Sequence, residues 1–259
     1  ARGITLTEKG KTRTISCERE VILSAGAMHT PKLLMLSGIG PADELRRHGM
    51  AGVAADDGAG ANLQNHPGVD IQFGTAYQDS LTSQLGLLRR PGIGLEYLLK
   101  KQGLATTNFF ETGAFLRTRD DVTHPNMQYE FLPLTRQLRR GKLVPVPGFQ
   151  FWMDLARPLS RGAVTLRSAD PNDRPSVVFN HLHEQRDLRD LIDGVKIARE
   201  VLVRQQAWQK YRPVQLSPGP DCSSDADLEA FVRRAVGTSY HASGSCRMGV
   251  DDNSVVDEH

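Results

Sequence analysis

Alternating hydrophobic and polar positions predict a β-hairpin at the start of the chain. Ile4–Leu6 and Thr12–Ser16 alternate on either side of the polar turn Glu8-Lys9-Gly10-Lys11. The next apolar run, Glu20–Ser24, is short and contains β-branched residues, so we expect a buried strand there.

Small residues follow this expected strand and lead into a predicted helix. After Ala25-Gly26-Ala27, Thr30-Pro31 supplies a capping residue and a proline suited to the first helical position, which predicts a helix over Lys32–Ser37. A strand, a turn of small residues and a helix N-terminus together place backbone N–H groups where they can face an anionic or planar ligand. A plain strand–helix connection explains this pattern alone equally well.

The middle of the chain carries several strand-like runs in succession. A short helix is expected at Leu95–Lys101, and Arg136–Pro147, which is basic and contains prolines, is expected to be a mobile loop. Strands that follow one another without intervening helices favour a mainly antiparallel sheet. The expected strands are Phe109–Leu116, Met127–Leu134, Phe149–Ala156, Ala163–Arg167 and Ser176–Phe179.

Two helices are predicted after these strands. Asp187–Gln205 places Leu188, Leu191 and Val195 on one apolar stripe, as expected for a helix that faces a core. Ser224–Val236 begins with a sequence that resembles a capping box. This second helix leads the chain to Tyr240 and His241.

Composition narrows the class of protein. The chain has 259 residues, of which 39% are hydrophobic and 24% charged, enough for one large or two modest domains. Its 32 basic and 30 acidic residues leave a net charge of +2, which gives no electrostatic case for nucleic acid. The three cysteines show neither disulfide nor metal-ligand spacing, so we expect no metal site and a reducing, cytoplasmic compartment, with membrane association of a longer protein left open.

Both ends of the chain suggest that it is part of something longer. Ala1–Leu6 begins as a strand already under way, and residues 254–259 stop as an apolar run begins. No apolar run approaches the length of a membrane span.

One stretch near the C-terminus carries candidate chemistry. Ser239–Gly249 contains His241 beside Tyr240 and a run of small residues. Small residues let backbone approach a flat ligand closely, and histidine can exchange a proton near neutral pH. This stretch alone favours a loop histidine without chemistry. Only the rest of the chain makes a chemical role the better interpretation.

The context is a set of segments: Ala25–Pro41, Asn62–Pro67, Arg157–Pro171, and Tyr240–Gly249 with Val255–Asp257. Together these segments resemble the glucose-methanol-choline (GMC) family of flavin oxidoreductases. Asn65 stands where the family usually has aspartate. Residues 107–113, 125–129 and 216–219 look most like choline dehydrogenases.

The resemblance implies an α+β fold: a substrate domain with a mainly antiparallel sheet plus helices, attached to an incomplete, Rossmann-like FAD-binding domain. It assigns residues 1–67 and 237–259 to the FAD-binding part and 68–236 to the substrate domain. The family's glycine-rich finger, ribose-binding acid and second catalytic residue have no counterpart in this sequence.

The resemblance also implies an activity: FAD-dependent oxidation of a choline-like primary alcohol to the aldehyde, by hydride transfer to flavin N5. His241 matches the proton acceptor, and Ala25, Gly26, Asn62 and His66 match cofactor-binding positions, with His66 read as structural or cofactor-lining. The implied partner is a small-molecule alcohol. The identity of the electron acceptor, the choice between an oxidase and a dehydrogenase, and the formation of a homodimer are left open.

Glu111 and Phe110 are the expected substrate-binding pair. A carboxylate among aromatic rings can bind a quaternary ammonium. An exposed strand glutamate is the alternative interpretation. The chain alone is expected to be inactive, and the alternative functions are a hydroxynitrile lyase on the same fold or a non-catalytic substrate-domain fragment.

Overall fold

The computed structural model describes residues 1–76, 81–110, 112–139 and 141–258, without the side chains at 138, 139, 201 and 202. The chain forms two compact units. Unit 1 comprises Ala1–Leu63, Gly162–Val178 and Ala242–His259, and unit 2 comprises Gln64–Arg161 and Phe179–His241. Each unit is described by itself.

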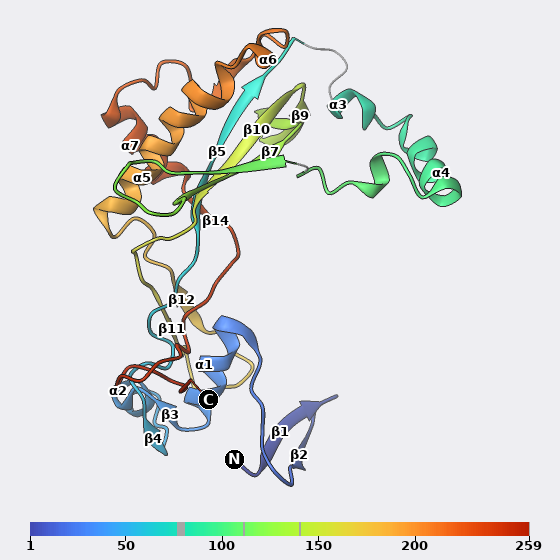
Figure 1. The fold of residues 1–259 in the computed structure, drawn as a ribbon. Coiled ribbons are helices and arrows are strands. Elements are labelled where there is room, and N and C mark those ends of the chain that lie inside the picture. Colours follow the sequence, from blue (N-terminus) through green and yellow to red (C-terminus); the bar gives the residue numbers. More distant parts are fainter. Residues whose placement is uncertain (77–80, 111, 140, 259) are drawn as a thin grey trace. The chain divides into compact units, whose positions relative to one another are not determined.

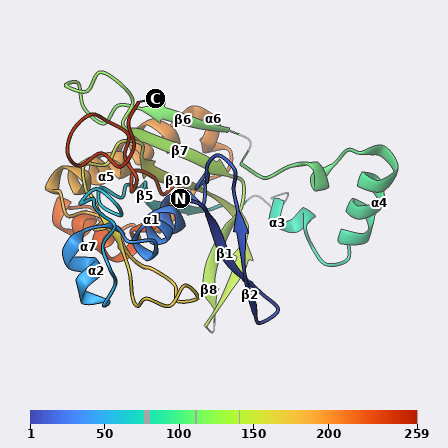
Figure 2. The same cartoon turned by 90° about the horizontal axis from the view of Figure 1, so that it is seen from below.

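Unit 2 is built on an antiparallel sheet with the strand order β13–β5–β10–β7–β6, and β14 also pairs with β5 (Figures 1 and 2). The central pair is β5 with β10. The strands are β5 (Pro67–Gly74), β6 (Thr112–Leu116), β7 (Met127–Leu132), β10 (Gly148–Leu155), β13 (Val214–Ser217) and β14 (Gly237–Thr238).

Helices cover one face of this sheet (Figure 1). They are α5 (Gln185–Ile197), which continues as the π-helical turn η2 (Ala198–Val203), and α7 (Asp225–Ala235). Every second strand residue points toward them, and these side chains form the main core with Leu188, Leu191 and Leu228. Gly194 lets α5 approach the strands, since a Cβ there would lie 2.6 Å from Met153 Cε.

The alternate strand residues lie on the opposite face, which we call the polar face. Trp152 on β10 pairs directly with Asp70 on β5 and with Glu130 on β7. The polar face carries Asp70, Gln72, Gln128, Glu130, Gln150, Trp152 and Asp154, together with Leu132 at the end of β7.

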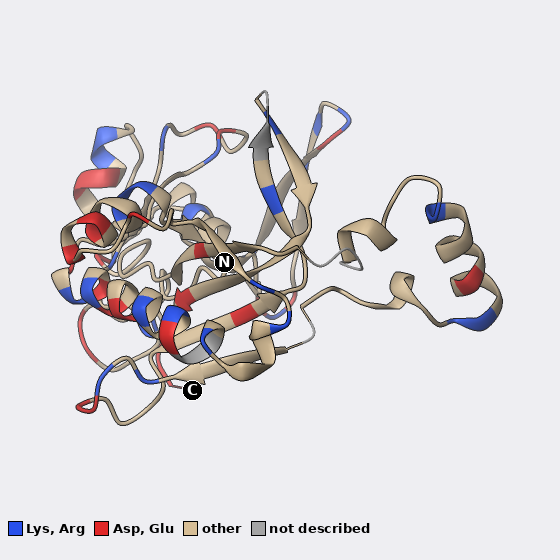
Figure 3. Cartoon of the chain, turned by 90° about the horizontal axis from the view of Figure 1, so that it is seen from above, with Lys and Arg blue, Asp and Glu red and all other residues tan. Residues whose placement is uncertain are grey.

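Two further parts of unit 2 lie outside the sheet. The helix α3 (Leu81–Gln84) contacts β9 through the Thr82 hydroxyl, which donates to the carbonyl of Val146 at 3.1 Å. The helix α4 (Arg90–Lys100) stands away from the strands (Figure 1), and none of its residues is buried. A 3-10 turn, η1 (Leu104–Thr106), follows α4. The short helix α6 (Gln206–Gln209) follows η2. Figure 3 shows Lys and Arg positions interspersed with Asp and Glu positions along the helices.

Residues 136–147 were expected to be a mobile loop, but the described residues among them are mostly in strands. They form most of an antiparallel hairpin, β8 (Thr135–Arg139) with β9 (Lys142–Val146). The prolines are compatible with it because a two-stranded ribbon has free edges, where a missing N–H leaves no ladder partner unsatisfied.

Unit 1 is assembled from short elements. The predicted hairpin is confirmed as β1 (Gly3–Glu8) and β2 (Lys11–Ser16). The helices are α1 (Gly26–Leu36) and α2 (Ala42–Arg47). β3 (Ile39–Gly40) pairs in parallel with β4 (Ala54–Ala55), and β11 (Ala163–Thr165) pairs with β12 (Ser176–Val178). Its core is the small cluster of Met35, Leu45 and Leu166.

The expected strand at Glu20–Ser24 was wrong. These residues are in no strand, and Ile22 is 77% exposed. Apolar, β-branched composition favours a strand only where a partner strand offers hydrogen bonds and a surface to bury against, and no described strand pairs with this segment.

The first helix also begins earlier than expected. α1 starts at Gly26, so Pro31 lies inside it rather than at its first position. Pro31 has no N–H to donate to the carbonyl of Ala27, four residues earlier. The hydroxyl of buried Ser245 donates to that carbonyl instead, so the proline leaves no orphaned acceptor.

The α+β class with a mainly antiparallel sheet is confirmed. The assignment of parts to FAD-binding and substrate-binding domains stays a prediction. None of the helices in the described ranges is long and apolar enough to cross a membrane.

Candidate active site

Two histidines lie together at one end of the sheet in unit 2. β14 pairs with the start of β5, which brings His66, just before β5, beside His241, just after β14. Their rings meet edge to face, with centroids 5.4 Å apart and an interplanar angle of 89°. The backbone N–H of Ser239 donates to the carbonyl of His66 at 3.1 Å, which ties the two segments together.

Asn65 fixes the backbone at both histidines. Its carboxamide oxygen accepts from the backbone N–H of His66 at 3.0 Å and of His241 at 2.9 Å, while its amide donates to the Thr238 hydroxyl. The side chain is 3% exposed, so water offers little competition for these bonds. From the sequence, Asn65 was recognised only as a departure from the family pattern. Its hydrogen bonds to the backbone of both histidines were not predicted.

A buried carboxylate lies beside the histidine pair. Asp154 on β10 is 1% exposed, and its Oδ2 accepts from the indole Nε1 of Trp152 at 3.1 Å and from the hydroxyl of Ser239 at 2.7 Å. Its Oδ1 lies 3.7 Å from Nδ1 of His66. Asp154 and Trp152 were not found from the sequence, since they belong to a strand about 87 residues before His241.

The polar face continues from this cluster along the sheet. Asp70 lies directly opposite Trp152, and the amide of Gln150 donates to its carboxylate at 2.9 Å. Burial raises the pKa of Asp70 to about 6, against a smaller lowering effect of the Arg136 guanidinium. The indole of Trp152 lies against backbone, since a Cβ at Gly68 would come within 2.7 Å of the ring.

Unit 1 has a hollow of about 520 Å³ at the start of α1. No side chain caps this helix end, and Gly26 has a φ of +79° with open space where a Cβ would be. Uncapped amides and the helix dipole favour an anionic group there. The lining is mostly small: Leu23, Ser24, Gly26, Ala27, Thr30, Ala242, Ser243, Gly244, Ser245, Cys246 and Val256.

These features of the hollow suit part of a flat, phosphate-bearing cofactor. Small side chains allow close approach of a planar ring system, and the helix end supplies N–H donors. Gly26 lies in the lining and Ala25 is the residue that precedes α1. Asn62 has a φ of +56°, and its amide donates to the carbonyl of Gly244, a lining residue, at 3.1 Å.

The structure says less about the predicted substrate pair. Glu111 lies outside the described residues. Phe110 is about half exposed, just before β6. Among the described residues, no cluster of three or more acidic, histidine or cysteine side chains could hold a metal ion.

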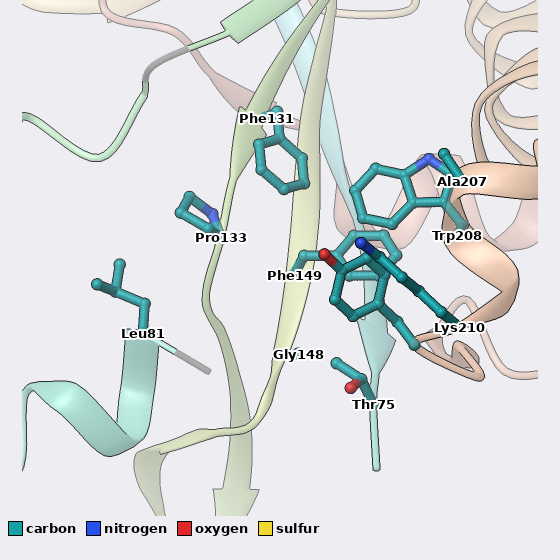
Figure 4. Close-up of a pocket in the computed structure, with 10 residues that line it drawn as sticks. Thr75, Leu81, Phe131, Pro133, Gly148, Phe149, Ala207, Trp208 and Lys210 are labelled. Atoms are coloured by element: carbon teal, nitrogen blue, oxygen red, sulfur yellow. The ribbon is translucent and has the colours of Figure 1, made fainter. Parts of the chain in front are cut away.

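An apolar pocket of about 420 Å³ lies on the helix-covered face of the sheet in unit 2 (Figure 4). Trp208 stacks on Phe149 with centroids 4.4 Å apart, and Lys210 lies beside them. Phe149 is five residues along β10 from Asp154 and points to the other face. The pocket is therefore separate from the histidine pair.

Comparison with known proteins identifies the class. Two sequence models described as GMC oxidoreductase match residues 1–68 and 158–259, which together are well over half of the chain. The chain belongs to the GMC oxidoreductase family, and members of this family bind FAD.

Within the family, the chain is similar to oxygen-dependent choline dehydrogenases. The protein of that name from Burkholderia cenocepacia (strain HI2424) is 42% identical over 258 residues, 100% of this chain and 45% of that protein. The chain thus spans about half the length of the curated relatives it matches.

Solved structures show the same fold. A formate oxidase aligns with a TM-score of 0.89 at 27% identity, over 99% of this chain and 50% of that one. A variant of the Aspergillus oryzae RIB40 formate oxidase, studied for its FAD modification, aligns with a TM-score of 0.84 at 26% identity, over 95% of this chain and 48% of that one.

Proposed function

We propose that this chain contributes the substrate-side part of an FAD-dependent enzyme that oxidises a choline-like primary alcohol to the aldehyde, with His241 as the proton acceptor. The observation that carries the proposal is the pairing of His241 with His66 next to a buried carboxylate. The 42% identity to proteins named choline dehydrogenase supports the substrate class.

The geometry around His241 suits a general base. Its imidazole is exposed, so a hydroxyl group can reach it, while Asn65 holds its backbone N–H and the His66 ring lies against its own. A base contributes most when it is held at hydrogen-bond distance from the proton that it removes. FAD, when bound, supplies the hydride acceptor at its N5 atom.

The hollow in unit 1 is the proposed contact for part of the cofactor. The backbone N–H groups at the start of α1, from Gly26 onward, would face a phosphate or a ring edge. The amide of Asn62 would hold the Gly244 segment through its hydrogen bond to the carbonyl of Gly244. At about 520 Å³ the hollow has room for a part of FAD. We therefore propose that the 259-residue chain alone does not retain FAD and is inactive.

The carboxylates of the polar face would present negative charge to the substrate. Asp70 and Glu130 flank Trp152, two carboxylates with an aromatic ring between them in neighbouring strands. Such surroundings favour a cationic substrate over a neutral one. Glu111 and Phe110 stay the proposed ammonium-binding pair.

The test uses the full-length protein that carries this sequence, purified with FAD. Choline is added without oxygen, and the visible absorbance of the flavin is followed, with a neutral primary alcohol of similar size as the control. Bleaching by choline in preference to the neutral alcohol is the expected result. Turnover of a cyanohydrin without bleaching by either alcohol would contradict the proposal and indicate the lyase alternative.

A second measurement tests the inactivity of the isolated chain. The purified 259-residue protein is expected to show no flavin absorbance, while the full-length protein is yellow. A yellow 259-residue chain that oxidises choline would show that the hollow in unit 1 suffices for the cofactor.

A further inference from the structure

The Asp154 carboxylate is only partly satisfied by its neighbours. Both of its hydrogen bonds, from Trp152 and Ser239, end on Oδ2, and Oδ1 is buried without a hydrogen-bond donor. A buried carboxylate oxygen without a donor is costly. Among the residues that the structure describes, His66 is the basic side chain that lies within 4 Å of this carboxylate.

His66 presents the matching unsatisfied atom. Its Nδ1 is also buried without a hydrogen-bond partner, and it lies 3.7 Å from Oδ1 of Asp154. A movement of about 0.5 Å would bring the two atoms to an ordinary hydrogen-bond distance. One N–H at Nδ1 satisfies both orphaned atoms at once.

The other side of the His66 ring is accessible. The side chain is 30% exposed although Nδ1 is buried, so the exposed part includes the edge away from Asp154. A neutral imidazole with its proton on Nδ1 has an acceptor lone pair on Nε2. The same ring contacts His241 edge to face.

We propose that Asp154 is a positioning residue that holds the proton of His66 on Nδ1, and so makes His66 a second proton-accepting imidazole beside His241. A proton that leaves the alcohol oxygen then resides on an imidazole nitrogen of the pair, and the buried carboxylate balances the positive charge. The inference rests on the proposed function for its role in catalysis, but the assignment of the proton does not.

The buried arrangement predicts a specific effect of Asp154→Asn. The Ser239 hydroxyl needs an acceptor, and the Trp152 indole donates both to Asp154 at 3.1 Å and to the Ser239 hydroxyl oxygen at 3.0 Å. The single amide oxygen of the variant would therefore stay on the side of these two donors, and its NH2 group would face His66. Nδ1 of His66 would then have to accept a hydrogen bond, which moves the ring proton to Nε2. A wrong tautomer of this kind removes the acceptor from the reacting side.

The test is nitrogen NMR of the histidine side chains in the full-length protein with FAD, with the His66 signal assigned by its loss in His66→Gln. The expected result is the Nδ1–H tautomer in the wild type and the Nε2–H tautomer in Asp154→Asn. Asp190→Asn removes another buried carboxylate of unit 2, one that pairs with Arg119 and Arg186, and is expected to leave the His66 tautomer unchanged. An Nε2–H tautomer in the wild type overturns the proposal even if no variant folds.

Kinetics distinguish positioning from a merely structural role. Asp154→Asn is expected to lower kcat about 10- to 100-fold with KM nearly unchanged, whereas Asp190→Asn leaves kcat as it is. Unchanged kcat in a folded Asp154→Asn protein with the altered tautomer would contradict the catalytic role of His66. If the wild type oxidises no alcohol but shows the Nδ1–H tautomer, the proposed function fails and the assignment of the proton stands.

Discussion

The two units differ in how much hydrophobic core each contains. Unit 2 packs two helices onto a sheet and buries a large continuous cluster between them. Unit 1 has the small cluster around Met35, and it exposes Ile22, Leu33 and Val53. The histidine pair belongs to unit 2 and the candidate cofactor hollow to unit 1, so the proposed reacting side chains are held by the better-packed unit.

This difference in packing indicates that the histidine pair is held more rigidly than the hollow. Asn65, Asp154 and Ser239 join the histidines to strands that are themselves packed against α5 and α7. The hollow in unit 1 is lined instead by loop backbone and one helix end. We therefore expect the histidine site to be preformed and the hollow to depend on further contacts for its shape.

The largest expected effect compares one leucine from each unit. Leu191 is fully buried in α5, so Leu191→Ala is expected to lower the free energy of unfolding by about 3 kcal/mol. Leu33 in α1 is 39% exposed, and Leu33→Ala is expected to cost less than about 1 kcal/mol. Urea denaturation followed by tryptophan fluorescence measures both, and equal losses would contradict the difference between the units.

A somewhat smaller effect is expected at Asp70, on the polar face of unit 2. Burial raises the pKa of this carboxyl to about 6, so the folded state binds its proton more tightly than the unfolded state does. The contribution of Asp70 to the free energy of unfolding is therefore fully present below about pH 4, and it falls by up to about 3 kcal/mol as the pH rises through 6.

Asp70→Asn removes this penalty. The variant is expected to be more stable than the wild type at pH 8 by about 1–3 kcal/mol and nearly equal to it at pH 4. Urea denaturation at the two pH values measures the difference. A stabilisation that is the same at both pH values would show that the ionisation of Asp70 is not its cause.

The smallest expected effects come from removing one serine hydroxyl group in each unit. Ser224 caps α7 by accepting from the backbone N–H of Asp227, and Ser224→Ala is expected to cost about 1 kcal/mol of global stability. Ser245 donates to the carbonyl that Pro31 leaves free in α1, and Ser245→Ala is expected to cost a similar amount locally.

Hydrogen exchange separates these two outcomes. Faster exchange confined to α1 is expected for Ser245→Ala, and faster exchange throughout the sheet for Ser224→Ala. If Ser245→Ala accelerated exchange in β5 and β10 as well, the two units would not be independent in stability.

The sequence predicted the parts of the fold whose pattern is local. The apolar stripe of α5 and the capping box of α7 were both recognised, because each is complete within about a dozen residues. β7 and β10 were both expected as strand-like runs. β5, the centre of the sheet, was missed although Val69, Ile71 and Phe73 alternate with polar residues, because Pro67-Gly68 at its start is typical of a turn.

The site needed information that no local pattern contains. His241 was found through a family resemblance, and His66 through another segment of it, but nothing in the sequence placed them in ring contact. Asp154 and Trp152 are brought to them by strand pairing between β5, β10 and β14. Such contacts depend on register, which a sequence pattern leaves open until strand partners are known.

The most direct test of the central claim is the rate at which the bound flavin is reduced without oxygen in the full-length protein, for the wild type, His241→Ala and the exposed control His124→Ala. If His241 accepts the proton, His241→Ala reduces flavin about 100-fold or more slowly while still retaining FAD, and His124→Ala matches the wild type. Flavin reduction at the wild-type rate in His241→Ala would contradict the claim.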